Sequence, residues 1–382
     1  MNYMKKYLLI LAAVTISLIY GILIGKYEFY PYRILKNIQD NTDERLPIQK
    51  KTGDFFQYHY SQSDLENLLS VIPNKIDSIR KELSFKIFGT YTLPEQFPDT
   101  IYTIIDKSYN ELSNLEKIEQ FNIIQKHDIK SIGYIFHPKN SNNELLIYHQ
   151  GHQGDFIKGK NTIKYFLERG FTIYAFCMPL FGKNNQPMVY REKLGNILFS
   201  SHDRLKYLEN PIQYFIFPVI SMINYAEQKK FNSITMVGLS GGGWTTTLTA
   251  AVDSRVNYSF PVAGTYPMFI RFQKPTKNYG DWEQTYPILY SEINYLDMYV
   301  MGATGEDRFQ MQILNKYDEC CFDGDDYKIY ADFISSKVKI FKNGSFQVFS
   351  DSSHAEHKIS QIALTKILDE INSASNRVDG SD

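Results

Sequence analysis

The feature that most constrains the fold is the alternation of short apolar runs with amphipathic segments, which fills the chain after Glu116. Apolar runs such as ELLIYHQ and FTIYAFCMPL are typical of buried strands, whereas NTIKYFLERG has the spacing of a helix that ends at Gly170. Strands that alternate with helices are joined by right-handed crossovers, which produce a mostly parallel sheet with helices on both faces. We therefore predict an α/β fold, whose site lies at the carboxyl ends of the strands.

The same patterns predict the individual elements of this region. Strands are expected in IKSIGYIFHP, ELLIYHQ, FTIYAFCMPL, SITMVGL, VNYSFPVAG, LDMYVMGA and SFQVFS. Helices are expected in NTIKYFLERG, from about Asn210 to Lys229, from the glycine-rich turn after SITMVGL to Ala251, near YKIYADFISS and in SQIALTKILDEI. The rhythm is interrupted at about 268–296, where the mixed aromatic and charged residues fit an insertion near the site entrance or, equally, a long surface excursion.

The N-terminal segment has the pattern of a membrane anchor. An uncharged, largely apolar run extends from Tyr7 to Gly25 between lysines, and about 1.5 Å of rise per residue lets it just span a bilayer core of roughly 30 Å. No clear small-x-small cleavage site follows, so an uncleaved anchor over 1–29 is favoured over a removed signal. We predict a linker and helical extension over 30–115 and a catalytic domain over 116–382 that lies outside the cytoplasm.

Composition and charge exclude some classes of protein. Of the 382 residues 43% are hydrophobic, which is enough for a large core. The formal net charge of -1 gives no electrostatic argument for a nucleic-acid partner, although it does not exclude a local basic patch. The chain has 3 cysteines, too few for a disulfide framework. Adjacent cysteines such as Cys320 and Cys321 rarely bond to each other, so small buried residues are expected.

One turn carries the pattern of a nucleophile. Gly238-Leu239-Ser240-Gly241-Gly242 fits G-x-S-x-G, with an apolar strand before it and a helix after it. A serine on a sharp strand-to-helix turn needs small neighbours, because a Cβ beside it would collide with the adjacent strand or helix. The N-terminal amides of the helix then lie beneath the charge that forms on the substrate. The alternative, a glycine-rich turn whose serine only caps the helix, lacks this chemistry.

With this motif in its strand–turn–helix context, the chain resembles the α/β-hydrolase superfamily over roughly 116–371. The resemblance implies an α/β-hydrolase fold, a Ser-acid-His triad in that chain order and hydrolysis through an acyl-enzyme. It also implies an oxyanion hole, with one amide from Gly241, the residue after the nucleophile.

A second amide is expected from the loop His149-Gln150-Gly151-His152-Gln153-Gly154, which looks like the His-Gly-rich loop of the superfamily. We favour the backbone N–H of His152, with Gly151 and Gln153 as alternatives. The two histidines are expected to hold the shape of the loop by hydrogen bonds. No metal is predicted here, because no third ligand lies nearby in the sequence.

Two histidines follow the last predicted strand. His357-Lys358-Ile359-Ser360 is similar to the His-x-Ile-Ser stretch of the acyl-protein thioesterase and carboxylesterase branch, so His357 is preferred as the base. His354 remains the alternative, because it lies nearer the end of the strand. For the acid, Asp307 is chosen with Glu306 close behind, since both follow LDMYVMGA. Asp318 and Asp351 are less favoured, and Arg308 is expected to be a solvated base or the partner in a weak surface ion pair.

These residues predict a membrane-anchored serine hydrolase that cleaves a carboxylic ester of a small-molecule or acylated substrate. Peptidase or thioesterase activity, and a binding protein that keeps the fold without turnover, are the alternatives. No cofactor is expected, because acyl transfer by a triad needs none. The sequence leaves the substrate and the oligomeric state open.

Overall fold

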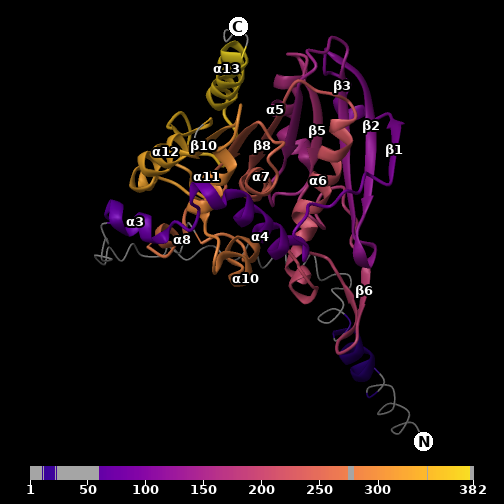
Figure 1. Cartoon of the computed structure of the whole chain (residues 1–382). Helices are drawn as coiled ribbons and strands as arrows, with labels where there is room; N and C mark the ends of the chain where they lie inside the picture. Colours follow the sequence, from indigo (N-terminus) through magenta and orange to yellow (C-terminus); the bar gives the residue numbers. More distant parts are fainter. Residues whose placement is uncertain are drawn as a thin grey trace, which may run out of the picture. The chain divides into compact units, whose positions relative to one another are not determined.

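The computed structural model describes residues 11, 13–21, 23, 60–273, 279–341 and 343–378 (Figure 1). The chain divides into two compact units, one of residues 1–57 and 186–200 and the other of residues 58–185 and 201–382. In the first unit, residues 11, 13–21 and 23 are helical. Strands β6 (Met188–Arg191) and β7 (Gly195–Leu198) form an antiparallel hairpin in the same unit.

The predicted anchor over 1–29 falls largely outside the described residues, and so does the linker up to residue 59. Among the residues that the structure does describe, none of the helices has the length and apolar character needed to cross a membrane. The anchor therefore stays a prediction.

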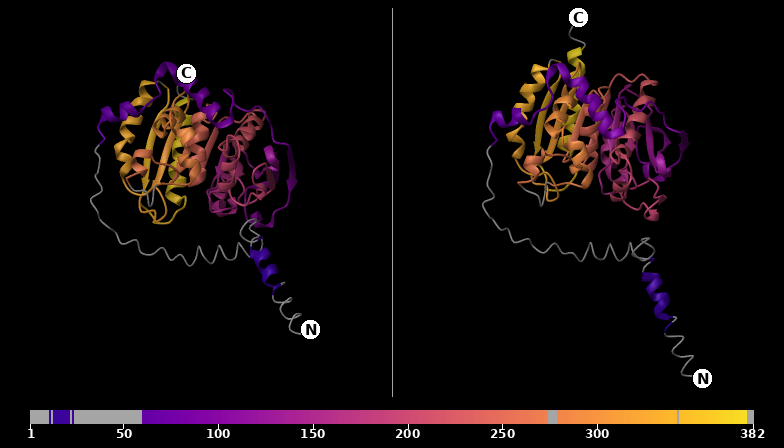
Figure 2. Two further views of the ribbon diagram at one scale, coloured as in Figure 1. Left: turned by 90° about the horizontal axis from the view of Figure 1, so that it is seen from below. Right: turned by 60° about the horizontal axis from the view of Figure 1, so that its bottom comes forward.

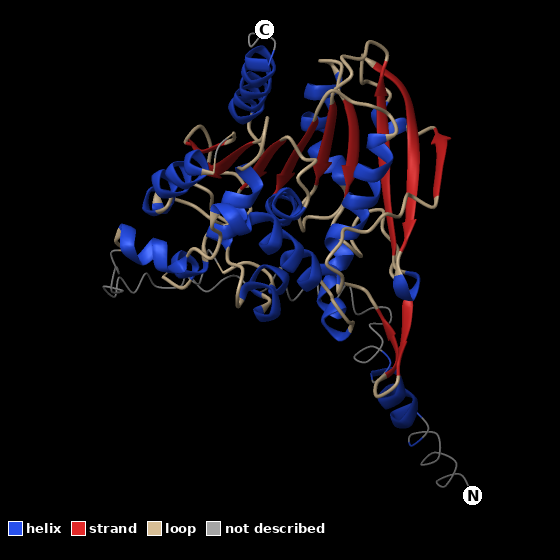
Figure 3. Ribbon diagram, viewed as in Figure 1, coloured by secondary structure: helices blue, strands red, loops and turns tan. Residues whose placement is uncertain are grey.

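The second unit is built on a sheet that has nine strands within the described ranges (Figure 3). The strands are β1 (Thr100–Ile104), β2 (Leu115–Ile124), β3 (Lys130–Pro138), β4 (Leu145–His149), β5 (Thr172–Phe176), β8 (Ile234–Leu239), β9 (Tyr258–Val262), β10 (Phe309–Asn315) and β11 (Ser345–Asp351). Their order is β1-β2-β3-β5-β4-β8-β9-β10-β11. The strands from β5 to β11 in this order are parallel, and β1, β2 and β3 add an antiparallel end.

Helices cover both faces of this sheet, as predicted (Figures 1 and 2). The described helices of this unit are α3 (Gln62–Leu68), α4 (Ile76–Phe88), α5 (Lys160–Leu167), α6 (Gln213–Glu227), α7 (Gly241–Val252), α8 (Met268–Arg271), α10 (Pro287–Tyr290), α11 (Tyr295–Ala303), α12 (Ala331–Ile340) and α13 (Gln361–Val378). On one face, Phe166 of α5 and Leu364 of α13 belong to one buried cluster with the strands. Helices α6, α7, α11 and α12 lie on the other face.

The strands predicted before the serine turn, and β9 and β11 after it, are confirmed, as are helices α5, α6, α7, α12 and α13. The sheet, however, begins before residue 116. Strand β1 follows helices α3 and α4 of the predicted helical extension and pairs with β2 from Thr100↔Asn122 to Ile104↔Ile118. Residues 58–115 of the predicted extension therefore belong to the same compact unit as the sheet.

The prediction of a strand in LDMYVMGA is wrong, because this run lies in helix α11. The helix is buried on all sides, so its sequence after Asp297 is apolar and shows no helical periodicity. Its start is fixed by a capping box, in which the Asn294 side chain accepts from the N–H of Leu296 at 2.8 Å and Asp297 accepts from the N–H of Asn294 at 2.9 Å. The strand of this region is instead β10, FQMQILN.

Arg308, which was expected to be solvated, is buried at the start of β10. Its guanidinium donates to the carbonyl oxygens of Ala250 at 2.6 Å, Val256 at 3.0 Å, Met301 at 2.7 Å and Thr304 at 3.0 Å. Burial lowers the pKa of Arg308 to about 9, so the side chain is a cation at neutral pH. Arg308 thus satisfies carbonyl groups at the carboxyl ends of α7 and α11 together.

Replacing this cation should destabilise the protein. We expect Arg308→Leu to lower the free energy of unfolding by about 3 kcal/mol or more, because several buried carbonyls lose their donor. Urea unfolding followed by circular dichroism measures the change. The control Lys164→Met removes a cation at the helix surface, where it pairs with Glu168 at 3.9 Å, and should change stability by less than about 0.5 kcal/mol. Similar losses in the two variants would contradict the role of Arg308.

Candidate active site

Ser240 stands on a strained turn between β8 and α7. Its backbone has φ 59° and ψ -122°, a conformation that costs a residue with a side chain roughly 1–3 kcal/mol. Two hydrogen bonds hold it, because the Ser240 N–H donates to the Val262 carbonyl at 2.8 Å and the Trp244 N–H donates to the Ser240 carbonyl at 3.0 Å. The hydroxyl is partly exposed at the carboxyl end of a parallel strand.

The glycines of the turn are required by close backbone contacts. A Cβ at Gly238 would lie 2.1 Å from the Gly242 carbonyl oxygen, and one at Gly242 would lie 2.0 Å from that of His149. A Cβ at Gly243 would lie 2.8 Å from the Val262 carbonyl oxygen. Helix α7 therefore starts against the ends of β4, β8 and β9, and no larger residue fits at these positions.

The threonines of α7 fit a helix that is buried along its whole length. The hydroxyls of Thr245, Thr246 and Thr247 donate at 3.0, 2.8 and 3.1 Å to the carbonyls of the glycines four residues earlier. Each hydroxyl thus finds a partner within its own helix, so these polar residues can pack as small core residues.

The loop after β4 lies directly against Ser240. A Cβ at Gly151 would be 2.7 Å from the Ser240 Cβ and 3.3 Å from the Gly241 nitrogen, while a Cβ at Gly241 would be 2.4 Å from Cε1 of His152. The structure therefore brings together Ser240, Gly241, Gly151 and His152. These are the residues that the sequence assigned to the nucleophile and the oxyanion hole.

His149 holds the shape of this loop, as the sequence predicted. Its Nδ1 lies 2.9 Å from the Gln150 carbonyl oxygen, and burial lowers the pKa of His149 to about 4. The ring is therefore neutral at neutral pH, and the acceptor at Nδ1 requires the proton on that nitrogen. Tyr148 completes the arrangement by donating to the Gln150 side chain at 2.5 Å.

A buried acid–histidine pair follows the last two strands of the sheet. His357, after β11, places its Nδ1 2.7 Å from Oδ2 of Asp318, after β10. Asp318 is fully buried, and its other oxygen accepts from the N–H groups of Cys320 at 2.8 Å and Cys321 at 3.3 Å. Because β8, β10 and β11 are parallel, this pair lies at the same edge of the sheet as Ser240.

The electrostatics of the pair suit a histidine that accepts a proton. Burial raises the pKa of Asp318, but the hydrogen bonds from His357 and Cys320 outweigh it and hold the pKa below its ordinary value. The carboxylate therefore accepts the Nδ1 proton of His357, which leaves the lone pair on Nε2. Within the described part of the chain, this Nε2 is buried and has no hydrogen-bond partner.

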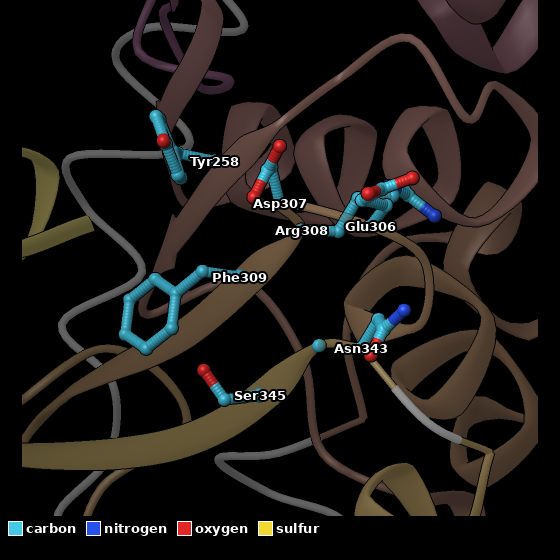
Figure 4. A pocket seen from close by; sticks show the side chains of 8 residues that line it. Tyr258, Glu306, Asp307, Arg308, Phe309, Asn343 and Ser345 are labelled. Atoms are coloured by element: carbon cyan, nitrogen blue, oxygen red, sulfur yellow. The ribbon is translucent and has the colours of Figure 1, made fainter. Parts of the chain in front are cut away.

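Glu306 and Asp307, the acids preferred from the sequence, lie elsewhere. They precede β10 and line a pocket with Tyr258, Phe309 and Ser345, at the amino ends of β9, β10 and β11 (Figure 4). The structure thus places them at the sheet edge opposite Ser240 and corrects their selection. The cause is the misassigned strand, because taking α11 for the strand put its end one element too early.

His354 and Asp351 make separate contacts. His354 lies 3.4 Å from Oδ2 of Asp351 and 3.9 Å from Oε2 of Glu356. Asp351 accepts hydrogen bonds from the hydroxyls of Ser353 and Ser360, so it fixes the turn that leads into α13. Asp318, which the sequence argument set aside, is the carboxylate that contacts His357.

Among the residues that the structure describes, two groups of side chains have donor atoms close enough to hold a metal ion. Cys320, Cys321 and His357 form one, but the two cysteines are joined by a disulfide, a pairing that the sequence argument disfavoured. The other consists of His152, His202, Asp281 and Glu283. Its members come from distant segments, so neighbouring positions in the sequence could not reveal them.

The shift in the pKa of Asp318 gives a prediction about acid stability. A carboxyl whose folded pKa lies below its unfolded value of about 3.9 stabilises the fold above that pH, and the stabilisation is lost as pH falls through the folded pKa. We expect Asp318→Asn to lower the free energy of unfolding by about 1–3 kcal/mol at pH 7. The curves of wild type and variant should converge as pH falls through the folded pKa of Asp318.

Urea titrations between pH 7 and 2.5 measure the free energy of unfolding of wild type and Asp318→Asn. Asp369→Asn, on the exposed face of α13, is the control. A difference between wild type and Asp318→Asn that stays constant over this range would show that the ionised carboxylate is not the stabilising form.

Comparison with known proteins agrees with the architecture. A family model described as PhoPQ-activated pathogenicity-related protein matches residues 216–306. No curated protein matches the chain. The solved structure of the methylesterase BT1017 is 15% identical over 82% of this chain and 67% of that chain, with a TM-score of 0.62. An acetyl xylan esterase from Paenibacillus sp. R4 is 13% identical over 82% of this chain and 99% of that chain, with a TM-score of 0.52. The chain has the fold of the α/β-hydrolase superfamily, as its serine motif implied.

Proposed function

We propose that the protein is a serine hydrolase that cleaves carboxylic esters through a triad of Ser240, His357 and Asp318. The observation that carries the proposal is the buried hydrogen bond of 2.7 Å between His357 and Asp318. This hydrogen bond lies at the same sheet edge as Ser240, which stands on a strained turn directly after β8. A histidine with a lone pair at Nε2 and a serine on such a turn are the parts that acyl transfer needs.

In the proposed mechanism, Nε2 of His357 takes the proton of the Ser240 hydroxyl as its oxygen attacks the ester carbonyl. Asp318 holds the ring in place and stabilises its charged form. The Gly241 N–H and an amide of the 149–154 loop, which we assign to His152, stabilise the oxyanion. The proton then passes to the leaving alcohol, and water attacks the acyl-enzyme by the same route.

An ester is preferred over an amide or thioester as the substrate because two solved structures with this fold are named methylesterase and acetyl xylan esterase. The geometry of the triad is common to all three reactions. No cofactor takes part in the proposed steps.

We also propose that the apolar run from Tyr7 to Gly25 anchors the chain in a membrane, with the hydrolase unit outside the cytoplasm. Added protease should then remove the hydrolase unit from intact cells. Protection in intact cells together with cleavage after lysis would reverse the orientation, and recovery of the chain in the supernatant after lysis would refute the anchor.

The nucleophile can be tested with a fluorophosphonate probe, which reacts only with an activated serine. We expect the full-length protein in detergent to be labelled and Ser240→Ala to be unlabelled and inactive on acetyl and methyl esters, because the attacking oxygen is gone. The control Ser233→Ala changes a partly exposed serine just before β8 and should react like wild type. Ester hydrolysis that survives in a folded Ser240→Ala variant would refute the assignment.

Two matched pairs of variants, one pair for the histidine and one for the acid, test which residues belong to the triad. We expect His357→Ala to reduce kcat by about a thousandfold or more and Asp318→Asn to reduce it strongly, because base and orienting group are lost. His354→Ala and Asp307→Asn should stay within about threefold of wild type. Steady-state ester hydrolysis measures all four. A strong effect of Asp307→Asn, with little effect of Asp318→Asn, would restore the acid preferred from the sequence.

A further inference from the structure

Beside the oxyanion loop lies a cluster of four side chains that the proposed mechanism does not use. His152 belongs to the loop after β4, and His202 begins a short 3₁₀ helix (His202–Tyr207). Asp281 and Glu283 lie at the start of another 3₁₀ helix (Trp282–Thr285). One donor atom from each of the four side chains lies within 4.8 Å of the others. Three segments far apart in the sequence thus converge on one point.

The deepest members of the cluster lack the partners that buried polar atoms normally have. Glu283 is 0% exposed and His202 is 5% exposed. Within the described residues, neither ring nitrogen of His202 nor Oε2 of Glu283 has a hydrogen-bond partner, although Nε2 of His202 lies 3.4 Å from that oxygen. Buried polar atoms nearly always have a hydrogen-bond partner or a ligand. These three atoms therefore point to a ligand that binds between them.

The chemical groups of the cluster identify the kind of partner. Nε2 of His152 lies 3.0 Å from Oε1 of Glu283, and Nδ1 of His152 lies 3.1 Å from Oδ2 of Asp281. The ring centroids of His152 and His202 are 4.8 Å apart. Two carboxyl groups and two imidazole rings thus meet in a small volume, and these are groups that bind a divalent transition-metal cation.

We propose that His152, His202, Asp281 and Glu283 bind a divalent transition-metal ion, with Zn²⁺ as the best match. Two imidazole nitrogens and two carboxylate oxygens are a tetrahedral donor set typical of zinc, whereas Ca²⁺ and Mg²⁺ prefer oxygen donors alone. Bonds of about 2.0–2.2 Å place tetrahedral donors roughly 3.4 Å apart, so the side chains close on the ion by small movements.

The position of the cluster indicates what the ion does. The His152 ring lies against Gly241, where a Cβ would be 2.7 Å from Nδ1 of His152. Four protein ligands fill a tetrahedral shell and leave no place for substrate, so the site is structural. The ion fastens the loop beside Ser240 to the segment that carries Asp281 and Glu283. The inference is independent of the reaction catalysed at Ser240.

The test uses full-length protein purified without a polyhistidine tag, stripped with a chelator and dialysed against zinc. We expect inductively coupled plasma mass spectrometry to find one zinc ion per chain, and zinc to raise Tm by several degrees relative to the stripped protein. Glu283→Gln and His202→Asn should bind zinc at least tenfold more weakly and lose the rise in Tm. The control His137→Gln alters another histidine–glutamate pair, in which Nε2 lies 2.7 Å from Glu119, and should bind zinc like wild type.

A second measurement covers variants that do not fold. Cobalt added to the stripped wild-type protein should give the intense visible absorption of tetrahedral Co²⁺, and zinc should displace it. Stripped wild type that takes up no zinc and gives no such spectrum would overturn the proposal and leave an ion-pair network. Zinc binding of equal strength in the folded Glu283→Gln and His202→Asn variants would overturn it as well.

Discussion

The close approach of α7 to the ends of β4, β8 and β9 is the constraint on which the site depends. The carbonyl oxygens of His149 and Val262 occupy the space where side chains of Gly242 and Gly243 would lie. This contact forces the sharp turn at Ser240, and the two backbone hydrogen bonds of Ser240 hold its strained conformation. The loop after β4 reaches Ser240 for the same reason, because His149 both ends the strand and packs on the start of α7.

The other half of the site depends on the pairing of β10 with β11. Asn315 and Asp351 are partners at the ends of these strands. The buried amide of Asn315 donates to Asp318 at 3.2 Å and to the Lys358 carbonyl at 3.0 Å, so one side chain ties the loop of the acid to the loop of the histidine. At the opposite end of β10, Arg308 fixes the carboxyl ends of α7 and α11. Both ends of this strand are therefore held by buried polar contacts.

The His152 cluster gives the oxyanion loop a second support. His149 shapes the start of the loop from within, through its bond to Gln150. The His152 side chain instead joins the loop to Asp281 at 3.1 Å and to Glu283 at 3.0 Å, in the segment that interrupts the α/β rhythm. The segment at about 268–296 thus contacts the 149–154 loop and helps to position it beside Ser240.

Particular residues show how much of the fold and of the candidate site could be predicted from the sequence. The strand–turn–helix around Ser240 was predicted because its glycines, its strand and its helix are all local features, and most of the other strands and helices after residue 116 followed from periodicity. Asp318, the acid of the proposed triad, was not favoured from the sequence because helix α11 is buried on all sides and loses its helical period. Two signals could have corrected this, namely the Asn294 and Asp297 capping box and the alternation of Phe309, Met311 and Ile313 with glutamines.

The sequence by itself therefore determined the fold class, the place of Ser240 and the two histidines after the last strand. Only the tertiary structure decided that His357 pairs with Asp318 and that His152, His202, Asp281 and Glu283 meet. Local patterns record which face of an element is buried and where it ends. They do not record which distant side chains share a point in space, because that is set by the pairing of strands and the packing of helices on them.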